Sequence, residues 1–290
     1  KHYDTHGYTL YATEKKATGN FIGFIGIRFA DYLKEYFNPA PEIAWRLSYK
    51  HWGKGYATEG AQAVLQYAFN ELSLFEVISL ASECNQRSLR VMQKIGLKHD
   101  SNDDFDHPQI DDANPLKRHV LYRLNRTEYY TLMRDRIVKL AKNECQENVC
   151  NEKYLSSIRK HLIIKDPSFK DINKKFDWCG AYTHYILKQS GINLPIEYKS
   201  SHFGFVKTWV EWATHNNYII TNADHVIPGD LVVFDKLLSE HNMDHIGIVV
   251  DQVNSGVICS EGNIENRAQL INRKINANIN CFIRIGGIND

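Results

Sequence analysis

The sequence predicts two domains, an α/β domain followed by an α+β domain. Three observations support this prediction. The chain has 290 residues, which is long enough for two domains of typical size. In the first half, a strand-like segment at residues 42–48 runs through a glycine-rich turn into a helical pattern at residues 57–72. In the second half, one helix-like segment that ends near residue 191 precedes a series of strand-like segments.

The composition excludes several classes of function. Lys and Arg (35) nearly balance Asp and Glu (34), so the chain lacks the basic excess that nucleic-acid binding requires. No apolar run approaches ~18 residues and no leader-like segment opens the chain, so we expect no membrane association and a cytoplasmic location. The six cysteines form no CxxC pair and no zinc spacing, which predicts reduced thiols and no metal. The oligomeric state stays open.

The first half begins with residues typical of β-strands. Tyr8 to Thr13 and Phe21 to Phe29 are apolar, aromatic and β-branched, and glycines interrupt them. Glu42 to Ser48 alternates apolar and polar residues, as a half-buried strand does. Further strands are expected at Glu76 to Ala81 and at His119 to Leu124, on either side of a polar insert.

Glycines punctuate residues 51–60 (HWGKGYATEG), where the expected strand meets the expected helix. Glycines let the backbone turn tightly and approach a ligand. The unpaired N–H groups of the first helical turn, together with the helix dipole, attract an anion. The sequence therefore predicts a pyrophosphate site here, and the alternative is an ordinary glycine-rich loop.

This segment, together with residues 85–97 (NQRSLRVMQKIGL), resembles the GNAT acetyltransferases, especially their ribosomal-protein-acetylating branch. Trp52 stands where the general signature has Gln or Arg, as is common in that branch. The resemblance implies a GNAT-type mixed sheet with helices over residues 1–126, acetyl-CoA as cofactor, and a small-molecule or protein amine as acceptor. The implied cofactor-binding residues are Leu47, Trp52, Gly53, Lys54, Gly55, Tyr56, Ala57 and Asn85.

The resemblance also predicts weak acetyl transfer. The family normally has a strand and two helices ahead of Tyr8, so the front end of the domain is expected to be missing. Many members carry a tyrosine acid at the place of Met92, whose thioether cannot donate a proton. Ser88 or Tyr122 could supply that proton instead. Glu83 and Glu42 could accept the amine proton, or could be plain surface and strand-end carboxylates.

Residues 127–175 are expected to form connecting helices, because apolar residues recur at helical spacing from Thr127 to Asn148. Beyond them, Cys179 precedes a helical segment that is stopped by Gly191. A helix dipole stabilises a thiolate at its N-terminus, which favours a nucleophilic role for Cys179 over that of a small core residue.

Three expected strands follow at residues 230–234, 244–250 and 256–263, and His245 lies at the start of the second. A nucleophile on a helix, a base on a neighbouring strand and a third polar residue that orients the base form the papain-type arrangement. Residues 178–181 (WCGA), 228–234 (PGDLVVF), 245–249 (HIGIV) and 261–263 (EGN) resemble the CHAP and NlpC-type cysteine amidases and peptidases.

This second resemblance implies a papain-like cysteine amidase fold over residues 176–290, with Cys179 as nucleophile and His245 as base. It implies that Glu261 or Asn263 orients His245 while the other polarises the site. The two lie two apart on a strand, so both are expected to face the same side. His241, in the preceding loop, is the less suitable base. The implied substrate is a peptide or peptidoglycan-like amide.

Together, the two halves predict a bifunctional enzyme in which an acetyl-CoA-dependent N-acetyltransferase is fused to a cysteine amidase. The alternative is a binding or regulatory protein in which the first domain is inactive and only the amidase, or neither domain, is catalytic.

Overall fold

The computed structural model describes residues 1–147, 153–155, 158, 177–192, 194, 197–199, 201–254 and 256–286. The chain divides into two compact units, Lys1–Tyr129 and Tyr130–Asp290. The division lies close to the boundary expected after Arg126. Cys150, Phe176 and about half of the expected connecting segment lie outside the described residues.

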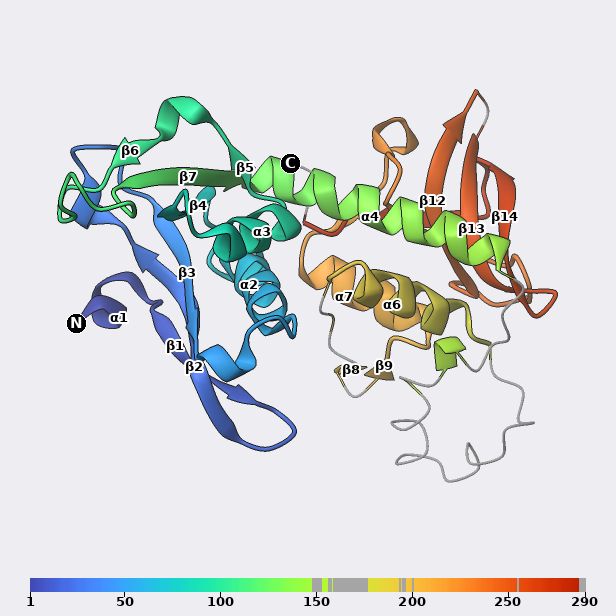
Figure 1. Cartoon of the computed structure of the whole chain (residues 1–290). Helices are drawn as coiled ribbons and strands as arrows, with labels where there is room; N and C mark the ends of the chain where they lie inside the picture. The colour runs from blue at the N-terminus through green and yellow to red at the C-terminus, as the bar shows by residue number, and fades with distance from the viewer. Residues whose placement is uncertain are drawn as a thin grey trace. The chain divides into compact units, whose positions relative to one another are not determined.

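The first unit is built on one mixed sheet (Figure 1). Its strands are β1 (Leu10–Lys15), β2 (Asn20–Phe29), β3 (Pro41–Leu47), β4 (Glu76–Ser82), β5 (Lys98–His99), β6 (Phe105–Asp106) and β7 (Arg118–Asn125). The order is β1-β2-β3-β4-β7-β5, and β6 pairs with β7. Neighbours are antiparallel except β3 and β4, which are parallel. A sheet with one parallel pair confirms the expected mixed architecture of this half.

Each face of this sheet has its own apolar cluster. The helices are α1 (His2–His6), α2 (Tyr56–Gln66), which continues as a π-helical turn over Tyr67–Glu71, and α3 (Gln86–Ile95). On one face, Ile22, Ile25 and Leu47 pack with Tyr56 and Val64 of α2. The other face carries a second cluster that joins β4, β6 and β7 to the segment between β2 and β3: Ala30, Leu33, Phe37, Ala40, Ile78, Phe105 and Leu121.

The second unit contains an antiparallel sheet in the order β10-β15-β11-β12-β13-β14. The strands are β10 (Ile219–Ile220), β11 (Leu231–Phe234), β12 (His245–Val253), β13 (Gly256–Ile264), β14 (Arg267–Lys274) and β15 (Ile279–Ile283), and a separate pair is formed by β8 (Glu197–Tyr198) and β9 (Ser201–His202). The helices are α4 (Arg126–Gln146), α6 (Cys179–Gln189) and α7 (Val206–His215). Helix α4 begins at the end of the first unit, and most of its length belongs to the second.

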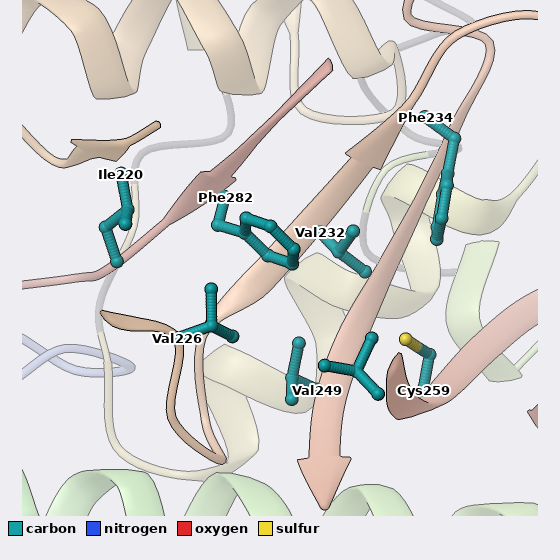
Figure 2. Close-up of a cluster of buried hydrophobic side chains, with 8 residues drawn as sticks. Ile220, Val226, Val232, Phe234, Val249, Cys259 and Phe282 are labelled. Atoms are coloured by element: carbon teal, nitrogen blue, oxygen red, sulfur yellow. The ribbon is translucent and has the colours of Figure 1, made fainter. Parts of the chain in front are cut away.

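One face of this sheet carries an apolar cluster of buried side chains (Figure 2). The cluster draws on β10, β11, β12, β13 and β15 and on the segment between β10 and β11, through Ile220, Val226, Val232, Phe234, Val249, Val257, Cys259 and Phe282. All eight are at most 2% exposed. Because side chains alternate along a strand, Glu261 shares the face of Val257 and Cys259. A buried carboxylate therefore lies on the same face as the apolar core.

Helices α4 and α6 contact the opposite face. The Ser260 hydroxyl lies 2.5 Å from the Tyr182 hydroxyl of α6 and donates to the Ala141 carbonyl of α4 at 3.2 Å. Helix α4 is thus an integral part of the second unit rather than a connector. At the start of α6, a Cβ on Gly180 would lie 2.5 Å from the Gly204 carbonyl oxygen, so only glycine allows this close approach. The first turn of α6 is held between the sheet and the 203–204 loop.

A buried ion pair fixes one end of the second sheet. Arg284 donates to both oxygens of Asp230, at 2.9 and 2.8 Å, and the Ile227 N–H donates to the same carboxylate at 2.8 Å. Burial raises the pKa of Asp230, and the Arg284 guanidinium partly offsets this rise. The Pro-Gly-Asp turn ahead of β11 therefore has a structural explanation.

Candidate active sites

The first candidate site lies where β3 leads into α2. Gly53 and Gly55 have positive φ angles of 71° and 84°, and Gly55 is the N-cap of α2. A Cβ at either position would meet nothing within 4 Å. Glycine is thus required here by the left-handed backbone and not by crowding. The turn opens onto free space, as a ligand cradle needs.

The backbone N–H groups of Gly53 to Thr58 have no acceptor among the described residues. The first bond of the helix is donated by the Glu59 N–H to the Gly55 carbonyl. Free N–H groups at a helix N-terminus, added to the positive end of the dipole, form a site for an anion. The anion site expected from the sequence thus has the required geometry.

The Trp52 side chain braces this turn from one side. Its indole N–H donates to the Leu47 carbonyl at 2.7 Å, and the Arg87 guanidinium lies 4.8 Å from its ring centre. This cation–π contact brings a positive charge from α3 beside the turn. Arg87 was not among the residues expected at the site, because nothing in its local sequence distinguishes it from an ordinary surface arginine.

Strands β3 and β4 pair at Glu42 and Ile78. No register pair is found beyond this point between the described residues of the two strands. The Ser79 hydroxyl closes the junction by donating to the Ile43 carbonyl at 2.9 Å. The edges that follow, toward Leu47 on β3 and Ser82 on β4, leave backbone groups free for an extended ligand.

Asn85 has a local role in the structure. Its side-chain oxygen accepts a hydrogen bond from the Ser88 N–H at 3.2 Å, which makes it the N-cap of α3. The side chain is exposed, and its amide group is left free to donate to a ligand.

The acid–base candidates of the first unit differ in their environments. Met92 is 1% exposed and has no proton to give. Glu42 is 3% exposed and is bound by Arg28 at 2.7 Å and by the Tyr32 hydroxyl at 2.8 Å. A carboxylate held in this way is a structural ion pair and is poorly placed to accept an amine proton. Tyr122 accepts from Gln93 at 3.3 Å, so its own hydroxyl proton remains available.

The second candidate site lies in the second unit, where α6 begins. Cys179 is the first residue of α6 and is 2% exposed. His245 begins β12, and Glu261 lies on β13, both with no exposed surface. The His245 Nε2 atom lies 2.9 Å from the Glu261 carboxylate. The structure thus brings three of the expected residues together from one helix and two strands.

The electrostatics of His245 link it to both neighbours. Burial lowers its pKa, but hydrogen bonding and charge attraction from Cys179 and Glu261 outweigh this effect and raise the pKa to about 9. Because Glu261 occupies Nε2, the ring nitrogen left for Cys179 is Nδ1, which makes no hydrogen bond to any of the described residues. This is the geometry of a base between a thiol and an orienting carboxylate.

Glu261 has a second partner that the sequence analysis did not predict. Arg273 on β14 donates to both carboxylate oxygens, at 2.8 and 2.7 Å. Burial raises the pKa of Glu261, but Arg273 and His245 together hold it below its usual value. The only sequence signal for Arg273 is the weak alternation of residues 267–274, in which Ile271 and Arg273 share a face.

Asn263 does not share the environment of Glu261, and the expected common face is wrong. The register of β13 against β14 shifts between Glu261 and Ile264, and Asn263 has a φ of 66°. A left-handed residue at a bulge breaks the alternation of side chains. Its amide instead donates to Asp177 at 3.1 Å, just ahead of α6. Of the two expected orienting residues, Glu261 is the one bonded to His245.

The other described cysteines lack such a setting. Burial raises the pKa of Cys145, that of Cys259 well above its usual value, and that of Cys281 to about 12. Cys84 is exposed and unpaired with any other sulfur. His241 lies in an exposed loop ahead of β12. Cys179 is thus the described cysteine that lies beside a histidine.

The described residues contain no group of three or more His, Cys, Asp or Glu side chains placed to hold a metal ion. None of the helices in the described part of the chain combines the length and apolar character that crossing a bilayer requires.

Comparison with known proteins identifies the first unit. Residues 1–98 match the family model of the acetyltransferase (GNAT) domain. The chain has an N-terminal GNAT acetyltransferase domain. This GNAT domain contains the turn at the start of α2, whereas Cys179, His245 and Glu261 lie outside the matched residues.

The match between this chain and its relatives covers only part of each relative's length. The chain is 36% identical over 94 residues to the uncharacterized protein YkkB of Bacillus subtilis, over 32% of this chain and 53% of that protein. It is 38% identical over 86 residues to the FsC-acetyl coenzyme A-N(2)-transacetylase of Aspergillus fumigatus, over 29% of this chain and 37% of that protein. The chain thus spans about half or less of the length of these relatives. The crystal structure of a GNAT-family acetyltransferase from Bacillus anthracis is 30% identical, with a TM-score of 0.34, and the match covers 41% of this chain and 67% of that one.

Proposed function

We propose that the chain is a two-domain enzyme, in which the GNAT domain uses acetyl-CoA to acetylate an amine and the second unit hydrolyses an amide through Cys179. For the first activity, the supporting observation is the row of free N–H groups from Gly53 to Thr58 within a GNAT domain. A pyrophosphate is an anion that such a row can bind. The Aspergillus relative is named as an acetyl coenzyme A transacetylase.

The GNAT domain acts mainly by holding its reactants in place. The free strand edges beyond Glu42 and Ile78 offer backbone partners to the amides of the pantetheine arm, and Asn85 lies at the head of the helix that follows β4. The acceptor is a small-molecule or protein amine. Its lone pair attacks the thioester carbonyl, the carbon–sulfur bond breaks, the proton of the amine passes to solvent water, and the departing sulfur takes up a proton. Tyr122 retains the proton needed for the last step.

Calorimetry with two probes tests the cofactor assignment. Acetyl-CoA should bind the full chain, whereas acetyl-pantetheine, which lacks the pyrophosphate, should bind at least about tenfold more weakly because the N–H row would have no anion to hold. Equal binding of the two probes, or no binding of either, would contradict the assignment.

One observation favours a second function for the GNAT domain. Met92 is buried where many family members have a tyrosine acid. A domain that binds acetyl-CoA but transfers slowly would serve as a binding or regulatory module. Vigorous acetylation of amines by the purified chain would rule out this alternative.

For the second activity, the supporting observation is the position of His245 between Cys179 and Glu261. When Cys179 and His245 form a thiolate–imidazolium pair, the Cys179 thiolate attacks the amide carbonyl. The N–H groups of the first turn of α6 stabilise the resulting oxyanion. The His245 imidazolium gives its Nδ1 proton to the departing amine. Water then attacks the acyl-cysteine, and His245 takes up the water's proton while the thiolate leaves. The substrate is a peptide or peptidoglycan-like amide.

Alkylation by iodoacetamide at mildly acidic pH tests this pair. We expect Cys179 to react faster than Cys84, although Cys84 is exposed and Cys179 is buried, because only a thiolate is a good nucleophile. His245→Ala should slow the labelling of Cys179 and leave that of Cys84 unchanged. Labelling that follows exposure alone, with no effect of His245→Ala, would overturn the amidase proposal.

A further inference from the structure

Arg273 makes a two-pronged contact with the carboxylate that holds His245. Its Nε donates to Glu261 Oε1 at 2.8 Å and its Nη2 donates to Oε2 at 2.7 Å. Oε2 also lies 2.9 Å from His245 Nε2. One carboxylate thus accepts from an arginine and a histidine at once. The guanidinium is also packed near the Phe234 ring, 5.4 Å from its centre, which restricts its position.

The burial of Glu261 and His245 makes the contact with Arg273 important for the protonation state of Glu261. Glu261 and His245 have no exposed side-chain surface, whereas the Arg273 side chain is 21% exposed. A carboxyl group buried without a cation takes up a proton rather than remain charged. A protonated Glu261 would donate to Nε2 and leave the ring proton on Nδ1, the ring nitrogen that Glu261 does not occupy. The base would then have no free lone pair.

We propose that Arg273 is a positioning residue of the cysteine site, which keeps Glu261 ionised and directs Oε2 at His245 Nε2, so that Nδ1 is kept for Cys179. This inference rests on the proposed amidase function and adds a fourth residue to its machinery. Arg273 acts through Glu261 and does not itself reach the reacting atoms.

The titratable and charged groups that interact with Glu261 come from the elements packed against it. They are His245 on β12, Arg273 on β14, Cys259 on its own strand, Cys145 on α4 and, through His245, Cys179 on α6. Arg273 is the permanent cation of this group. Its removal should therefore raise the pKa of Glu261, because the positive charge that favours its ionised form is lost.

The test is the pH dependence of the alkylation rate of Cys179 in the full chain, which requires no knowledge of the substrate. Arg273→Met should move the acid limb of this profile upward by about 1 pH unit or more, and should lower the plateau. Arg273→Lys keeps the positive charge but cannot make the bidentate contact with Glu261. It should return the acid limb to the wild-type position, while the plateau stays reduced.

Arg267 provides the matched control. It lies on the same strand, is 57% exposed and pairs with the exposed Glu265. Arg267→Met removes the same charge without touching Glu261 and should reproduce the wild-type profile.

The outcomes separate the inference from the function on which it rests. A wild-type profile that is insensitive to His245→Ala would refute the amidase function itself. A His245-dependent wild-type profile, with an acid limb that stays in place in Arg273→Met, would overturn the role of Arg273 alone. Circular dichroism would show whether Arg273→Met folds, and if it does not, Arg273→Lys provides the test. An acid limb that is displaced in Arg273→Lys contradicts the proposal. An acid limb at the wild-type position, with a lower plateau, supports it.

Discussion

The two candidate sites are built from different parts of the chain. In the GNAT domain, the anion site consists of backbone N–H groups from one continuous segment, Gly53 to Thr58. In the second unit, the site consists of side chains from three strands and one helix, brought together by the packing of the sheet against α6. A backbone site depends on local conformation, whereas a side-chain site depends on distant contacts. The two should therefore respond differently to substitution.

The largest difference should come from a single side chain at the cysteine site. Cys179→Ala removes the nucleophile and should abolish hydrolysis of a susceptible amide, with a loss of about 10⁴-fold or more, because the remaining groups cannot form the acyl intermediate. Cys84→Ala, at an exposed thiol of the GNAT domain, should leave the rate unchanged. Turnover of a peptidoglycan-type amide by both variants would measure this. Residual activity in Cys179→Ala would assign the nucleophile elsewhere.

A second substitution separates Glu261 from its neighbour Asn263. Glu261→Gln leaves the buried His245 and the partly exposed Arg273 without their anion, which should cost about 3–5 kcal/mol of stability and slow the alkylation of Cys179. Asn263→Ala removes the 3.1 Å contact to the exposed Asp177 and should cost about 1 kcal/mol or less. Urea unfolding together with alkylation kinetics would compare the two. If both variants lost stability and alkylation rate equally, Asn263 would again be a candidate for the residue that orients His245.

At the backbone site, the conformation of the chain rather than side-chain chemistry should determine how strongly acetyl-CoA binds. Gly55→Glu places a side chain at a φ of 84° and a negative charge beside the proposed pyrophosphate, and should weaken acetyl-CoA binding by about 100-fold or more. Gly19→Glu is the matched control, since Gly19 has a φ of 68° and equally open surroundings in the turn between β1 and β2. Calorimetry should find its affinity unchanged. A similar loss in both variants would mean that Gly55 matters for folding alone.

The same contrast explains what the sequence could predict. The turn at residues 51–60 lies in one segment, and glycine spacing is a local property, so the strand, the turn and the helix were all expected where the structure has them. The start of α6, the strand at His245 and the strand at Glu261 were also predicted, because their apolar runs are long and regular.

The features that the sequence did not predict depend on contacts between distant residues. Strand β14 has weak alternation because Leu270 lies on its exposed face while the polar Gln269 and Arg273 lie on its less exposed face, so the signal for Arg273 was too weak to use. Helix α7 and strand β15 were missed as well. Asn263 was placed on the face of Glu261 by simple alternation, and the bulge that rotates it is fixed by pairing with β14. The ion pair that holds Glu42 joins two strands that the sequence does not show to be neighbours.

The smallest expected effect is a difference in the response of two histidines to pH. The pKa of His245 is raised to about 9, so its protonated form stabilises the fold. This contribution is fully present below the unfolded pKa of about 6.5 and is lost as pH rises through 9. In the GNAT domain, burial and the nearby charges of His119 and Lys117 lower the pKa of His107. Protonation of His107 therefore favours the unfolded chain, and stability falls as pH drops below about 6.5.

Thermal unfolding of wild type, His245→Gln and His107→Gln between pH 5 and 10 would separate these contributions. Relative to His245→Gln, the Tm of wild type should decline as pH rises toward 9, because the charged ring loses its proton between Cys179 and Glu261. Relative to His107→Gln, the Tm of wild type should decline in the opposite direction, as pH falls below 6.5, and by less, because His107 is more exposed than His245. A His245→Gln difference in Tm that stays constant across this range would mean that folding leaves the proton affinity of His245 unchanged, which would contradict the thiolate–imidazolium pair on which the cysteine chemistry depends.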